Sequence, residues 1–190
     1  MKTFELTGSK RESTGKKAAK AYRKESLLPC VLYGGDEVVH FTVTKEGIRK
    51  LIYTPEVHIV NLSVEGKNYT AILKEMQTHP VSDEVIHADF LQIFKDKPVV
   101  LEIPIVLEGL AQGVKDGGKL SMDMRKLKVK GLYKDFPEKL VINIEDLGLG
   151  KTVQVGNLHF DNLEILNAKD NVVAAVKLTR AARGATATAK

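Results

Sequence analysis

The chain has 190 residues, of which 43% are hydrophobic and 28% charged, a composition typical of one large or two small globular domains. With one cysteine, Cys30, it is expected to have neither an intramolecular disulfide nor a cysteine-based zinc cluster. It lacks both the run of about 18 apolar residues that a membrane span needs and the apolar run of a signal peptide, so we expect a cytosolic protein with no membrane partner.

Positive charge is concentrated near the N-terminus. Residues 1–35 contain eight basic and three acidic residues, a net charge of +5, and the whole chain has the same net charge, from 29 basic and 24 acidic residues. Residues 36–190 are therefore balanced, and the local excess predicts a polyanionic partner, either nucleic acid or an anionic surface. Because tryptophan is absent and aromatic residues make up 6% of the chain, a broad stacking platform for single-stranded nucleic acid is not expected.

The first 95 residues predict a β-rich domain with two short helices. Alternating or apolar runs predict strands at 3–7, 29–33, 38–43, 57–64, 68–76 and 85–93. Gly34-Gly35-Asp36 and Glu65-Gly66-Lys67 are typical of hairpin turns. Helices are predicted at 16–24 and 45–52, the second with Thr44 as its N-cap and Pro55 after its end.

The charged run KDKP (95–98) indicates a domain boundary. Beyond it, strands are predicted at 99–107, 127–133, 139–146, 151–158 and 172–178, with turns at 117–118 and 167–171. The small, polar and basic residues 180–190 predict a disordered tail. The chain is thus expected to be mainly β with a few short helices, in an N-terminal domain (1–95) and an all-β C-terminal domain (96–179).

The basic segment GKKAAKAYRKE (15–25) predicts a cationic surface. At about 100° per residue on a helix, Lys16, Lys20 and Arg23 fall within ~60° of one another, whereas Ala18 and Tyr22 lie on the other side. This basic stripe (Lys16, Lys20 and Arg23) suits the phosphates of a nucleic acid, and Arg23 could bind two phosphate oxygens at once. The alternative is a solvated charged face without a ligand.

A second candidate lies in the segment VIHADF (85–90). On a strand, His87 and Asp89 share one face, while Ala88 and Phe90 point to the core. The pair could contact base edges or 2′-hydroxyls of RNA. It could also be a hydrogen-bonded surface pair without a ligand or, with His79 nearby, a set of metal ligands.

Catalysis is not indicated. The run GLGKT (148–152) resembles a phosphate-binding loop, but the required glycine is replaced by Glu145 and a strand pattern follows. Cys30 lies in an apolar strand, as an inert buried thiol does. We therefore expect no enzyme, cofactor or small-molecule substrate.

Three separated segments resemble one family, and together they cover nearly the whole chain. The run GKKAAKAYRKESLLPCVLYGG (15–35) resembles the N-terminal signature of the bacterial large-subunit ribosomal proteins that bind 5S ribosomal RNA. QTHPVSDEVIHADF (77–90) resembles the later Gln-x-His-Pro…His-x-Asp-Phe pattern of that family. Residues 98–178 resemble the extra domain of its long, general-stress (CTC) form.

The resemblance implies a six-stranded β-barrel that binds the loop E region of 5S ribosomal RNA across a widened minor groove. By position it implies RNA contacts from nine residues: Arg11, Lys16, Lys20, Arg23, Tyr33, Lys74, Gln77, His87 and Asp89. It also implies a place on the large ribosomal subunit in the cytoplasm, with the second domain against neighbouring ribosomal proteins or 23S ribosomal RNA at the central protuberance. The near-balanced charge of that domain favours protein contacts.

The sequence departs from the family pattern at three lysines. Lys17 replaces the usual glycine, Lys20 the usual arginine and Lys74 the usual glutamine. These changes reduce directional contacts, so we expect RNA binding with a larger salt-sensitive share. The competing hypothesis is a general-stress interaction protein that acts off the ribosome, which would not need the set of Arg11, Lys16, Arg23, His87 and Asp89.

Overall fold

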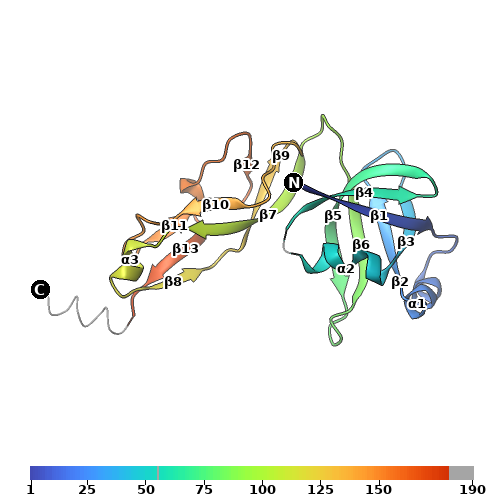
Figure 1. Ribbon diagram of the computed structural model, residues 1–190, viewed down its shortest axis with the longest axis horizontal. Coiled ribbons are helices and arrows are strands. Elements are labelled where there is room, and N and C mark those ends of the chain that lie inside the picture. Colours follow the sequence, from blue (N-terminus) through green and yellow to red (C-terminus); the bar gives the residue numbers. More distant parts are fainter. Residues whose placement is uncertain (55, 180–190) are drawn as a thin grey trace, which may run out of the picture. The chain divides into compact units, whose positions relative to one another are not determined.

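The computed structural model describes residues 1–54 and 56–179, which form two compact units (Figure 1). The first unit comprises residues 1–99 and 132–134, and the second comprises residues 100–131 and the described residues from 135 onward. Among the described residues, none of the helices has the length and apolar character needed to cross a membrane.

A closed barrel of six strands forms the body of the first unit, in the order β1-β3-β2-β6-β5-β4. Its strands are β1 (Lys2–Lys10), β2 (Leu27–Tyr33), β3 (Val39–Thr44), β4 (His58–Val64), β5 (Lys67–Thr78) and β6 (Val85–Gln92). β1 pairs in parallel with β4, and β2 in parallel with β6, while the other neighbours are antiparallel. Closure gives each of the six strands a neighbour on both sides, and it confirms the barrel that the family resemblance implied.

Both predicted hairpin turns are present. β2 and β3 form an antiparallel pair around Gly34, whose φ is +92°. Glu65 and Gly66 have φ values of 49° and 80°, and Val64 pairs directly with Lys67. Two consecutive residues at positive φ match the twist of the flanking strands and so fix the register of β4 against β5.

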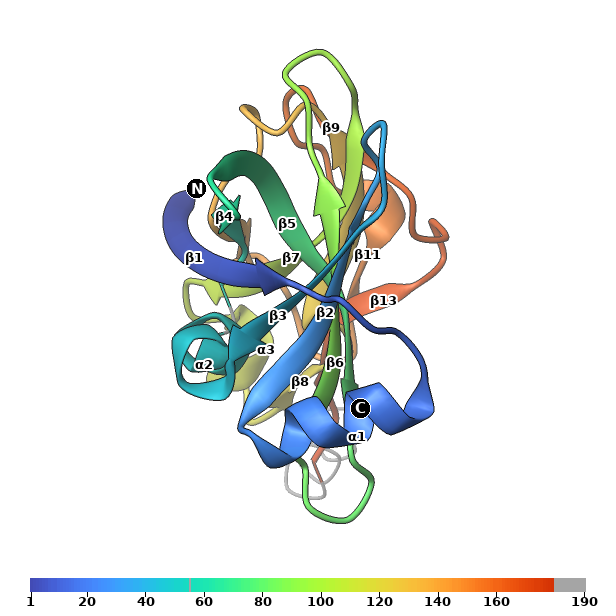
Figure 2. The same ribbon diagram turned by 90° about the vertical axis from the view of Figure 1, so that its right-hand side faces the viewer.

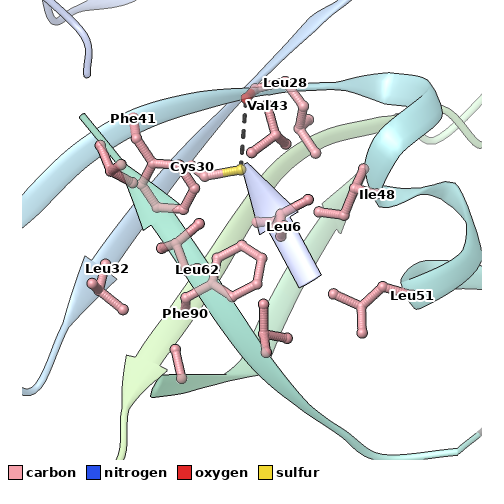
Figure 3. Packing of buried hydrophobic residues seen from close by; sticks show 14 residues of the cluster. Leu6, Leu28, Cys30, Leu32, Phe41, Val43, Ile48, Leu51, Leu62 and Phe90 are labelled. Carbon is pink, nitrogen blue, oxygen red and sulfur yellow. Dashed lines mark hydrogen bonds between the residues drawn. The ribbon is translucent and has the colours of Figure 1, made fainter. Parts of the chain in front are cut away.

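The barrel core consists of inward-facing side chains from its strands, closed at one end by a helix (Figure 3). Phe41 and Phe90 are fully buried, with ring centroids 5.6 Å apart. Cys30 is buried too, and its Sγ lies 3.6 Å from the carbonyl oxygen of Leu28. Burial of each large apolar side chain contributes about 1.5–3 kcal/mol, which makes this core the main source of stability of the unit.

Two helices accompany the barrel, within the bounds that the sequence predicts to about one residue. In α2 (Lys45–Tyr53), the Thr44 hydroxyl accepts a hydrogen bond from the Gly47 N–H at 3.2 Å, as expected of an N-cap. α1 (Lys16–Lys24) has no fully buried residue and lies across the beginning of β2 (Figure 2). Pro55, which was expected to follow α2, lies outside the described residues.

The second unit contains two sheets. The four-stranded sheet has the order β10 (Leu140–Asn143), β7 (Val99–Glu108), β9 (Lys126–Gly131) and β12 (Glu164–Ile165). The three-stranded sheet has the order β11 (Thr152–Gln154), β13 (Val172–Lys177) and β8 (Lys119–Met122). A one-turn helix, α3 (Gln112–Lys115), and a 3-10 turn, η1 (Val155–Asn157), complete it.

The mainly β fold is confirmed, with local differences in the second unit. The strand predicted at 151–158 ends at Gln154, because η1 follows and the chain turns. α3, β8 and β12 were not predicted, since segments of two to four residues are too short to show a periodic pattern. The predicted disordered tail, 180–190, lies outside the described residues.

Candidate nucleic-acid interface

The polar residues predicted to contact RNA lie on adjacent strands of the barrel. Asp89 of β6 pairs with Val31 of β2 on one side and with Glu75 of β5 on the other. Tyr33 lies two residues along β2 from Val31 and therefore on the same face. His87 lies two residues from Asp89 along β6. The structure thus brings together a polar face (Tyr33, His87 and Asp89).

His87 and Asp89 contact each other directly. Nδ1 of His87 lies 2.6 Å from Oδ1 of Asp89, and the two side chains are 24% and 26% exposed. Both of these atoms are shielded from solvent, and neither makes a well-aligned hydrogen bond with a described residue. The pair agrees with the surface-pair alternative, but the other ring nitrogen and the other carboxylate oxygen remain available to a ligand.

Tyr33 presents a neutral hydroxyl beside this pair. Partial burial raises the pKa of Tyr33, and the carboxylates of Asp89 and Glu75 raise it further, because each disfavours the tyrosinate. Tyr33 is therefore a hydrogen-bond donor at neutral pH. Beneath the face, burial raises the pKa of the Cys30 thiol well above its usual range, and Asp89 adds to this while Arg11 opposes it. Such a thiol is unreactive.

Helix α1 is anchored to β6 next to the polar face. Nε of Arg23 donates a hydrogen bond to the carbonyl oxygen of Ile86 at 3.0 Å, one residue from His87. That carbonyl oxygen is not engaged in strand pairing, because the pairing of β6 with β5 is irregular there and the pairing of β6 with β2 begins only at Ala88.

The basic stripe is consequently not a uniform solvent-facing row. Lys16 and Lys20 are exposed, whereas Arg23 is half-buried against the barrel. The two terminal nitrogens of Arg23 have no hydrogen-bond partner among the described residues, so they can still bind an anion. Arg23 is therefore the one residue of the basic stripe that is held against the barrel, and Lys16 and Lys20 are its exposed members.

Arg11 lies against the other side of α1. Its guanidinium carbon is 5.5 Å from the centroid of the Tyr22 ring, and its backbone N–H donates to the carbonyl of His40 at 3.0 Å. Nε of Arg11 is buried without a hydrogen-bond partner among the described residues. A buried donor of this kind costs free energy until an acceptor reaches it.

The remaining predicted residues lie on β5. Gln77 is exposed and pairs with His87 across the strands. Lys74 is also exposed, and it is the extra residue where the register of β5 against β6 shifts between Leu73 and Glu75. Both lie beside the polar face.

Sequence reasoning missed Glu75. Its carboxylate is exposed and lies across from Asp89, so the face carries two acids beside its cations. Only the irregular register of β5 against β6 brings them together. Among the described residues, no group of three or more His, Cys, Asp or Glu side chains could hold a metal ion.

Fold and site define a small closed β-barrel module with a cationic helix anchored beside a polar strand face. Comparisons with known proteins assign both parts of the chain. Residues 6–90 match the family model described as the Ribosomal L25p family, and residues 98–180 match that of the ribosomal protein TL5 C-terminal domain.

Relatives of similar length agree with this assignment, and the three described next are each named large ribosomal subunit protein bL25. That of Azobacteroides pseudotrichonymphae is 71% identical over 184 residues, covering 96% of this chain and 97% of that protein. That of Parabacteroides distasonis is 61% identical, covering 98% and 99%. That of Bacteroides fragilis is 57% identical, covering 100% and 99%. The chain belongs to the ribosomal L25p family, whose members are structural, non-enzymatic proteins of the large ribosomal subunit in the bacterial cytoplasm.

Proposed function

We propose that the chain binds 5S ribosomal RNA, in its loop E region, as a structural protein of the large subunit. The basic stripe and Arg11 contact phosphates, and the polar face contacts the shallow minor groove. Lys74 and Gln77 extend the contact along β5. The family resemblance is the basis for loop E, and the geometry of the site supports the proposed roles of the individual residues.

The observation that carries the proposal is the bond from Arg23 Nε to the carbonyl of Ile86. It holds the most basic segment of the chain one residue from His87, so cations and polar groups form one continuous surface. Arg11, whose guanidinium lies over the Tyr22 ring of α1, adds a further cation for a phosphate oxygen.

The carboxylates support an RNA ligand with exposed hydroxyls. Asp89 and Glu75 would repel phosphates, so this part of the surface needs hydrogen-bond donors from its ligand. The minor groove of RNA offers 2′-hydroxyls, which donate as well as accept, and duplex DNA does not. Tyr33, as a neutral hydroxyl, can both donate and accept there.

For the second domain (96–179) we propose contacts with neighbouring ribosomal proteins, and with 23S ribosomal RNA at the central protuberance. Residues 96–179 contain twelve basic and twelve acidic residues. The outward lysines of β9 lie near acids, since Lys128 is 3.5 Å from Glu102 and Lys130 is 3.4 Å from Glu164. A surface whose lysines lie beside acidic residues favours contacts with protein over contacts with phosphate.

The test is a titration of the full chain against isolated 5S ribosomal RNA at several salt concentrations, with a transfer RNA as the control. We expect binding to 5S ribosomal RNA to weaken as salt rises, because counterions are released from phosphates, but to remain tighter than binding to transfer RNA. Equal affinities for both RNAs that vanish together with salt would overturn the proposal. The off-ribosome interaction hypothesis would then be preferred.

A further inference from the structure

The outer side of α2 carries an uncovered aromatic ring. Tyr53 is the last residue of α2, and 69% of its surface is exposed. On α1 the corresponding ring, Tyr22, is half-buried and contacts Arg11. The Tyr53 ring, by contrast, is largely open to solvent.

Two hollows flank this ring. On one side is a groove of about 320 Å³, with an apolar floor formed by Leu28, Ile48, Ile52 and Val85. On the other side is a hollow of about 420 Å³, formed by Arg49, Lys50, Tyr53 and Thr54. Arg49 and Tyr53 border both hollows, so they form a ridge between them.

Of the three cations around these hollows, Arg49 and Lys50 have no acidic partner among the described residues. Lys45 is engaged, since its Nζ lies 3.3 Å from Oε2 of Glu84. Arg49 and Lys50 are exposed and have no ion pair or hydrogen bond from their side chains to any described residue. The C-terminus of any helix favours cations, so Lys50 is not by itself evidence of a binding site. That preference does not explain why Arg49 lies beside an exposed ring.

An arginine one helical turn from an exposed tyrosine matches the alternation of phosphate and base in single-stranded RNA. Residues at i and i+4 are neighbours on a helix surface, so Arg49 and Tyr53 present their cation and ring side by side. Bases stack on such rings with about 1–3 kcal/mol each, largely regardless of sequence. An acidic peptide would pair with the cations but would gain little from the flat exposed ring.

We propose that this α2 surface (Arg49, Lys50 and Tyr53) binds one unpaired nucleotide of RNA. Its base stacks on Tyr53 over the apolar groove, and its phosphate contacts Arg49 and Lys50. One ring accommodates one base, which is consistent with the low aromatic content of the chain. The contact is separate from the basic stripe and the polar face, so it goes beyond the proposed binding of 5S ribosomal RNA.

The test uses the full chain and a labelled single-stranded oligoribonucleotide of about 8 nucleotides that contains 4-thiouridine. We expect Tyr53→Ala to weaken binding about fivefold or more, because the stack is lost, and Tyr53→Phe to bind like the wild type. Arg49→Gln is expected to reduce the salt dependence, whereas the matched control Lys126→Gln, on the second unit, is not. Light-induced crosslinks should map to the peptide that contains Tyr53.

Unchanged affinity in Tyr53→Ala, or crosslinks confined to α1, would overturn the proposal and leave the groove to a protein segment. The affinity of Tyr53→Ala for 5S ribosomal RNA distinguishes this proposal from the function proposed above. We expect it to remain within about twofold of the wild type if the two surfaces are independent. If this variant lost affinity for both RNAs to the same extent, the inference would also be overturned, because the two surfaces would then form one site.

Discussion

Asp89 has polar neighbours on three strands. His87 on its own strand approaches to 2.6 Å, Glu75 of β5 lies opposite, and Tyr33 of β2 is close enough for Asp89 to raise its pKa. The contact with His87 orients the carboxylate before any ligand arrives, whereas the like charge of Glu75 repels it. An acceptor fixed in this way gives more binding free energy than a mobile one, because less side-chain entropy is lost on binding.

Replacement of Asp89 tests whether this orientation serves RNA. We expect Asp89→Ala to cost on the order of 1–3 kcal/mol in affinity for 5S ribosomal RNA, because a donor of the ligand is left without its acceptor. Asp89→Asn is the control of matched shape, which keeps one acceptor oxygen and loses the charge. Affinity would be measured by titration and the free energy of unfolding by urea denaturation. A loss of folding stability without any loss of affinity would instead mean that the His87–Asp89 pair is only structural.

At the scale of the element, few side-chain contacts hold α1 in place. The helix buries no residue fully and carries five basic residues in nine, so apolar packing alone holds it weakly. The bond from Arg23 to Ile86 ties its last turn to the barrel. Arg23 thus has two roles, an anchor through Nε and an anion-binding group through its terminal nitrogens.

Variants of Arg23 and Lys20 distinguish the anchoring of α1 from its positive charge. We expect Arg23→Ala to reduce the salt slope of RNA binding by about one and also to lower the free energy of unfolding by about 1 kcal/mol, because a hydrogen bond is lost. Lys20→Ala removes a charge from the same helix without breaking a bond, so only its salt slope should fall. The measurements are affinities at several salt concentrations and urea denaturation. If Arg23→Ala left slope and stability unchanged, neither role would stand.

The sequence predicted α1 well but not its anchor, for a physical reason. The bounds 16–24 follow from local periodicity, as does the shared face of His87 and Asp89, which are two residues apart on one strand. The contact of Arg23 with Ile86 spans 63 residues and depends on an irregular register of β6. Neither feature leaves a periodic trace in the sequence.

At the scale of the molecule, individual strands could be predicted but not their closure into a barrel. Alternation locates β2 and β6, yet their parallel pairing joins segments about sixty residues apart and came only with the family resemblance. The charge distribution, by contrast, follows from the sequence alone, because it requires only a count of the charged residues. All of the net charge lies in residues 1–35, which form β1, α1 and the first strand after it.

This distribution predicts which half of the chain supplies salt-dependent RNA binding. A fragment of residues 1–95 ends in the turn after β6 and keeps the whole barrel with its core. We expect it to bind 5S ribosomal RNA with the salt slope of the full chain, because every phosphate contact proposed with 5S ribosomal RNA lies within it. The matched fragment 96–179, with balanced charge, should show no salt-dependent binding in the same titration. If fragment 96–179 bound with a comparable slope, local fields from its lysines would outweigh its neutral total, and the second domain would be an RNA-binding element in its own right.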